Sequence, residues 1–124
     1  MIKAPVLFEK DCIFDDLYEA KMVNDKLDII KQTVLNFFPD CRIVLFGSRA
    51  RNPQSSGGDY DFLIIIRQDL DIKRKMYYKA HIRKMLAKEK IAADILIQST
   101  SELEVNKNLP GHIVREAIKE GLML

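Results

Sequence analysis

The sequence lacks the features that mark secreted, membrane-spanning and highly charged proteins. Its two cysteines, Cys12 and Cys41, are too few for a disulfide framework and form no metal-ligand spacing. No apolar run approaches the roughly 18 residues that a membrane span needs, and acidic residues follow the start too soon for a signal peptide. The net charge is only +2, which gives no argument for a DNA or membrane partner. These absences favour a reduced, cytoplasmic environment.

What the sequence does contain is the composition of one ordinary globular domain. Its 124 residues are 48% hydrophobic and 31% charged, which suits one core but not two. Residues 1–20 form an N-terminal arm whose pattern defines no structure, and residues 21–124 form the predicted domain. Whether the arm joins copies of the chain into a homo-oligomer stays open.

The spacing of apolar residues predicts helices and strands in a mixed order. Val23, Leu27 and Ile30 begin a stripe at intervals of three and four, which indicates a helix over residues 20–38. The other expected elements are strands at 42–46, 59–67 and 91–97, and helices at 71–89 and from Pro110 onward. This order predicts an α/β (α+β) fold, in which helices flank a small mixed sheet of three to four strands.

The expected helix over residues 71–89 is rich in lysine and arginine. Its core-side candidates are Ile72, Met76, Ala80, Arg83 and Leu86. The basic residues are most simply a solvated face; an RNA or an acidic partner surface is the alternative.

Three aspartates are candidates for chemistry. Asp59 and Asp61 open the second strand, where alternation puts both on one face with Cβ atoms roughly 6 to 7 Å apart. Asp94 lies within the apolar run of the third strand, where an unpaired charge is costly. If these strands are neighbours, the three carboxylates converge and can hold one or two magnesium ions. Otherwise Asp59 is a turn residue, Asp61 an arginine's partner and Asp94 an edge residue.

A second candidate site is the turn that ends the first strand. Gly47 and Ser48 can supply backbone N–H groups and a hydroxyl to the phosphates of a nucleoside triphosphate, or Ser48 can simply cap a short helical turn. Arg49 and Arg51 follow, either as phosphate ligands or as surface residues.

Together these motifs resemble the DNA polymerase beta-type nucleotidyltransferases. Gly47-Ser48, ten further residues and then Asp59-Tyr60-Asp61 match that signature. The chain is most similar to the minimal nucleotidyltransferase (MNT) proteins, which are paired with HEPN toxins in prokaryotic toxin–antitoxin systems. It departs from them at Gly58, where serine is common, and at Asn52-Pro53, where glycine commonly follows the second arginine.

The resemblance implies a nucleotidyltransferase fold, a reaction and a partner. Asp59, Asp61 and Asp94 would be the catalytic metal ligands for two magnesium ions, and Gly47 and Ser48 would bind the triphosphate. The implied activity is AMP transfer from ATP to a tyrosine of a HEPN toxin. The alternatives are an antitoxin that acts by binding alone, and a nucleotidyltransferase whose acceptor is a small molecule or an RNA end.

Overall fold

The computed structural model describes residues 14–51 and 58–124, with side chains from residue 25 onward. The predicted N-terminal arm therefore lies largely outside the described residues, as does the loop before Asp59. In chain order the elements are α1 (Phe14–Phe37), β1 (Arg42–Phe46), α2 (Ser48–Arg51), β2 (Tyr60–Ile66), α3 (Ile72–Lys88), β3 (Ala93–Ser99), α4 (Thr100–Asn106), α5 (Ile113–Glu120) and β4 (Leu122–Met123).

The strands form a mixed sheet in the order β3-β2-β1-β4. β1 is antiparallel to both β2 and β4, whereas β2 and β3 are parallel and joined through α3. This arrangement confirms the predicted class of a small mixed sheet flanked by helices. The short edge strand β4 had no counterpart among the expected strands.

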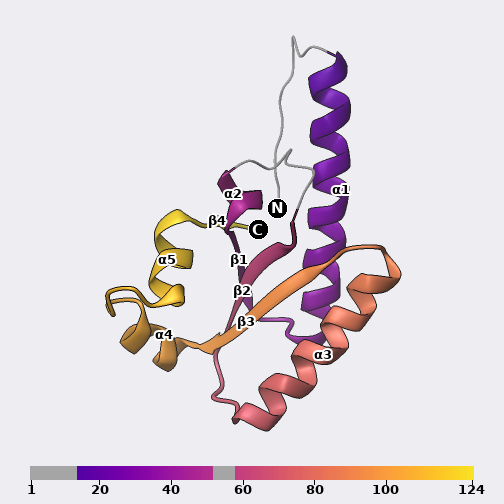
Figure 1. The fold of residues 1–124 in the computed structure, drawn as a ribbon. Helices are drawn as coiled ribbons and strands as arrows, with labels where there is room; N and C mark the ends of the chain where they lie inside the picture. Colours follow the sequence, from indigo (N-terminus) through magenta and orange to yellow (C-terminus); the bar gives the residue numbers. More distant parts are fainter. Residues whose placement is uncertain (1–13, 52–57) are drawn as a thin grey trace.

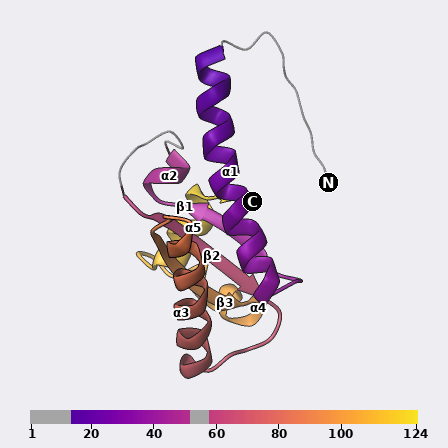
Figure 2. The same cartoon turned by 90° about the vertical axis from the view of Figure 1, so that its right-hand side faces the viewer.

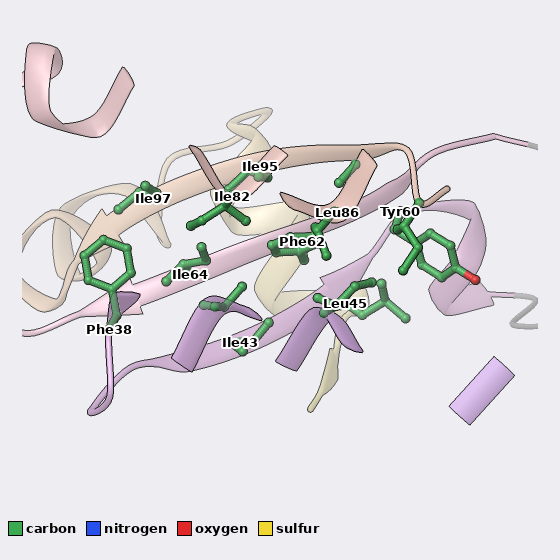
Figure 3. Close-up of a cluster of buried hydrophobic side chains, with 14 of the residues drawn as sticks. Phe38, Ile43, Leu45, Tyr60, Phe62, Ile64, Ile82, Leu86, Ile95 and Ile97 are labelled. Carbon is green, nitrogen blue, oxygen red and sulfur yellow. The ribbon is translucent and has the colours of Figure 1, made fainter. Parts of the chain in front are cut away.

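Helices cover both faces of the sheet (Figure 1). On one face, Phe62 and Ile64 of β2 pack with Ile82 and Leu86 of α3 and with residues of α1 (Figure 3). On the other face, Leu63 and Ile65 pack against α5. Burial on both sides explains why the sequence of β2 is apolar almost throughout.

The longest helix, α1, begins at Phe14, earlier than the predicted residue 20. Figures 1 and 2 both show that its N-terminal half extends past the sheet. Within residues 14–51 and 58–124, no helix combines the length and the apolar character needed to cross a bilayer.

Two predicted boundaries are displaced along the chain. β3 begins at Ala93 rather than residue 91, because the N–H of Ile91 donates to the Leu86 carbonyl and completes the end of α3. The last helix begins at Ile113 rather than at Pro110, because the His112 side chain accepts a hydrogen bond from Val114 and caps it there.

The predicted core face of α3 is wrong for four of its five residues. Ile72 and Met76 are 74% and 63% exposed, and Ala80 and Arg83 are also exposed. The buried stripe contains Ile82 and Leu86, with Tyr78 packed against the core. α3 rotates this way because Tyr78 meets the Phe38 ring, with 4.8 Å between ring centroids. Arg83 is therefore displayed on the surface.

Candidate active site

The register of the sheet brings two of the predicted aspartates side by side. Asp61 of β2 is the partner of Asp94 on the parallel strand β3 and of Phe46 on the antiparallel strand β1. Asp59 immediately precedes β2 at the same end of the sheet. By strand alternation Asp61 shares the face of Leu63, which α5 covers farther along. The carboxylates therefore lie together at the end of the sheet, beyond the part of that face that α5 covers.

The charges of these carboxylates act on one another. Partial burial raises the pKa of Asp61 above its usual value, and the negative charges of Asp94 and then Asp59 raise it further. The positive charge of Arg51 opposes the effect but does not cancel it. Repulsion among three carboxylates is relieved by a cation, and oxygen ligands of this kind suit Mg²⁺.

The carboxylates do not form a complete metal cage by themselves. Among the described residues, no group of three or more histidine, cysteine, aspartate or glutamate side chains is arranged to hold a metal ion. Mg²⁺ usually binds through one or two carboxylates and takes its other ligands from substrate phosphates and water. The residues present therefore fit an ion that binds together with a triphosphate.

Asp94 is not buried, contrary to the expectation from its apolar sequence context. It is the second residue of β3, and its side chain is exposed on the uncovered end of the strand. Its charge therefore carries no large desolvation cost, and it needs no partner within the fold. The sequence pattern could not show where the covering helix stops.

The turn after β1 lies directly against Asp61. Gly47 has φ +75°, and a Cβ atom placed there would collide with the Asp61 carboxylate. Glycine suits position 47 for two reasons: it adopts the left-handed backbone conformation without strain, and it leaves room for the Asp61 carboxylate. Ser48 is exposed, and a Cβ placed on Gly58 would lie 3.6 Å from its hydroxyl oxygen. The turn, Asp61 and the residue before Asp59 form one packed group.

The two predicted phosphate-binding arginines are engaged with the protein. Arg49 Nη2 donates to the Gly58 carbonyl at 3.1 Å, and its guanidinium lies 4.3 Å from the centre of the Tyr60 ring. Arg51 forms an exposed ion pair with Glu120 of α5, with 3.1 Å between Nη1 and Oε1. Arg49 therefore ties α2 to the residues that flank Asp59. Whether either arginine contacts a nucleotide stays a prediction.

Sequence reasoning missed two residues close to this group. Glu120 is far from Arg51 in the chain, so no local pattern could pair them. Arg83 was assigned to the core, yet it lines an open pocket of about 420 Å³ together with Asp59 and Asp94. The stripe of Tyr78, Ile82 and Leu86 was the available signal that α3 turns Arg83 outward.

Comparison with known proteins agrees with this geometry. The family model described as "Nucleotidyltransferase domain" matches residues 27–122. The match spans the Gly47 turn and all three aspartates, and it supports the predicted superfamily. No curated protein and no solved structure is similar enough to match. This chain belongs to the nucleotidyltransferase domain family.

Proposed function

We propose that the protein is a magnesium-dependent nucleotidyltransferase that transfers AMP from ATP to a tyrosine of a HEPN-type toxin and thereby acts as its antitoxin. Membership of the nucleotidyltransferase family supports the general reaction. The resemblance to the MNT proteins, carried by Gly47-Ser48 and the Asp59-Tyr60-Asp61 motif, suggests the acceptor and the biological role.

One observation carries the catalytic part of the proposal. Asp61 pairs with Asp94 in register, touches the Gly47 turn and has its pKa raised by neighbouring carboxylates. Anionic ligands for a cation thus stand beside a turn suited to phosphate. This is the arrangement that phosphoryl transfer requires, since such catalysis rests mainly on positioning and on charge stabilisation.

The residues of the site have two tasks in this reaction. Gly47 and Ser48 would bind the triphosphate, and Asp59, Asp61 and Asp94 would hold magnesium, which when bound would stabilise charge on the attacking and leaving oxygens. The tyrosine oxygen forms a bond to the α-phosphorus, the bond to the bridging oxygen breaks, and pyrophosphate leaves with the electron pair. The phenolic proton passes to Asp94, which is exposed and can release it to solvent.

The direct experiment incubates the protein with α-labelled ATP, Mg²⁺ and any HEPN protein that is found to be encoded beside its gene. Label is expected on a tyrosine of the HEPN protein and is expected to be lost in Asp59→Ala/Asp61→Ala. Asp69→Ala, at the opposite end of the sheet, is the matched control and should retain transfer.

The same experiment separates the alternatives. Neutralisation of the toxin that survives Asp59→Ala/Asp61→Ala without any label transfer would mean that binding alone silences the toxin. Label found on a small molecule or on an RNA end, with none on the HEPN protein, would keep the nucleotidyltransferase and reject the protein acceptor.

A further inference from the structure

The pocket that Arg83 lines opens beside the carboxylates and away from the Gly47 turn. Its walls are Asp59, Asp94 and Arg83, with small apolar side chains from the end of α3 and the start of β3, among them Ala87 and Ala92. The strand order places β2 between β1, which ends at the Gly47 turn, and β3, on which this pocket borders. The three aspartates therefore lie between two sides from which a molecule can reach the site, the side of the Gly47 turn and the side of the Arg83 pocket.

In an in-line displacement, the leaving group and the attacking group occupy these two opposite sides of the site. The attacking and leaving oxygens lie on opposite sides of the phosphorus. If pyrophosphate leaves on the side of Gly47 and Ser48, then the acceptor hydroxyl arrives from the side of Arg83. The small side chains of Ala87 and Ala92 leave room there for a group larger than water.

Arg83 is available to bind a group from another molecule. Its side chain is exposed, and its Nε lies 3.4 Å from the Ala93 carbonyl, near the outer limit for a hydrogen bond. Within the described residues it forms no ion pair at 4.0 Å or less, although Asp59 and Asp94 line the same pocket. A planar guanidinium held this way is suited to receive a carboxylate with two parallel hydrogen bonds.

The surroundings of Arg83 favour an acidic partner. Exposed Lys88 and Lys90 lie at the end of α3, with Glu89 as the one acid among residues 83–90. Exposed Met76, seven residues before Arg83, adds apolar surface on the same face of α3. A protein segment that carries carboxylates beside a tyrosine complements basic residues with adjacent apolar groups.

We infer that Arg83 is a specificity-determining residue that binds an acidic side chain of the acceptor protein next to the tyrosine that receives AMP. The inference rests on the proposed function and adds to it the entry side of the acceptor and the chemistry that selects it. It assigns Arg83 no part in binding ATP.

The test compares Arg83→Glu and Arg83→Lys with the matched control Lys84→Glu, an exposed neighbour that does not line the pocket. The KM for the HEPN protein and the KM for ATP are measured separately, and binding of the HEPN protein is measured without ATP. Arg83→Glu should raise the KM for the acceptor at least about tenfold, since reversing a paired charge weakens association strongly. The KM for ATP should not change, Arg83→Lys should restore part of the loss, and Lys84→Glu should have a small effect.

A charge swap completes the test. Changing the acidic residues around the modified tyrosine to lysine, one at a time, should yield one variant that Arg83→Glu accepts better than the wild type does. Equal effects of Arg83→Glu and Lys84→Glu, a parallel rise in the KM for ATP, or Arg83-dependent label on RNA would each overturn the inference.

Failure of the proposed function gives a different result. If the wild type labels no acceptor, loss of HEPN binding in Arg83→Glu but not in Lys84→Glu still supports this docking residue. If transfer proceeds normally in Arg83→Glu, the nucleotidyltransferase stands and the role of Arg83 is rejected.

Discussion

The two ends of the sheet use acidic residues in opposite ways. At the end where β2 and β3 begin, Asp59, Asp61 and Asp94 repel one another, and the pKa of Asp61 is raised. At the end where these strands finish, the pKa values of Asp69 and Glu102 are both lowered. The same kind of side chain is thus unsatisfied at one end and satisfied at the other.

The satisfied end is a closed network of hydrogen bonds. Ser101 donates to Asp69 at 2.8 Å, and hydrogen bonds from Ser99 and Ser101 lower the pKa of that carboxyl. Burial acts to raise the pKa of Glu102, but Lys75, 2.7 Å away, and the Ser99 backbone outweigh it. Ser99 and Glu102 also form the capping box that begins α4.

This comparison distinguishes structural from functional carboxylates in this fold. Asp69 and Glu102 find donors within the chain and so contribute to stability. Among the described residues, the site aspartates lie near one another, Arg51 and Arg83, but none forms an ion pair at 4.0 Å or less, and this points to a ligand. The following predictions test this contrast.

The largest effect is expected from Asp61→Asn. Transfer should fall by a factor on the order of 10³ or more, because a ligand for the cation and the charge that binds it are lost. The thermal unfolding midpoint at pH 7 should not fall. A raised carboxyl pKa stabilises the folded state fully below the unfolded value of 3.8 and loses that contribution as pH rises through the folded pKa, so ionised Asp61 opposes folding. A lower unfolding midpoint in Asp61→Asn would mean that ionised Asp61 stabilises the fold, and it would contradict the difference described between the two ends of the sheet.

Two glycine substitutions should separate function from packing. Gly47→Ala forces a Cβ into the Asp61 carboxylate and should reduce transfer by about 10²-fold, because small displacements of reacting groups are costly. Gly121→Ala forces a Cβ into Val44 and the Ala117 carbonyl and should cost about 1–3 kcal/mol of stability through overpacking. The folded fraction of Gly121→Ala should keep its transfer rate. Equal transfer losses per folded molecule would show that Gly47 has no special relation to the site.

Glu102→Gln should reduce the stability of the protein through the end of the sheet that holds Asp69 and Glu102, without affecting the site aspartates. It keeps the capping geometry but leaves Lys75, whose side chain is 15% exposed, without its charge partner. We expect a loss of about 1 kcal/mol at pH 7, limited by solvent screening at the partly exposed Glu102. Because the pKa of Glu102 is lowered, its contribution is present above the unfolded value of 4.5 and disappears as pH falls through the folded pKa. Urea unfolding of both proteins at pH 7 and at a series of lower pH values should therefore give a difference that is largest at pH 7 and shrinks as the pH falls below 4.5.

The smallest effect is expected at the loop between α3 and β3. Lys90 has φ 61°, the left-handed conformation that favours glycine after a helix. Lys90→Gly should raise the free energy of unfolding by about 0.5–1 kcal/mol, because it removes the clash of Cβ in that conformation. Lys90→Ala keeps a Cβ and should give no such gain. Equal stabilisation by both would assign the effect to the lost charge.

The sequence predicted the sheet well because its strands carry strong apolar signals. β1 agrees with its predicted range, and the alternation along β2 correctly separated the face of Asp61 from that of Tyr60. The convergence of Asp61 and Asp94 followed from the assumption that two strands are neighbours, which the register bears out.

The remaining features depend on contacts that no local pattern contains. The rotation of α3 is set by Phe38 and Tyr78, which lie far apart in the chain. The exposure of Asp94 depends on where the covering helices stop, and the Arg51 ion pair depends on the position of α5. Each of these required the packed structure.

The pairing of Asp61 with Asp94 limits how related sequences can change. The Tyr60 N–H donates to the Ala92 carbonyl at 2.9 Å, so the short connection from α3 fixes where β3 meets β2. Losing or gaining one residue there moves Asp94 to the opposite face of the sheet, since strand side chains alternate. We therefore expect insertions and deletions among active relatives to avoid residues 89–92, even though most of these residues are exposed. We therefore expect active relatives to share the length of that connection rather than its composition.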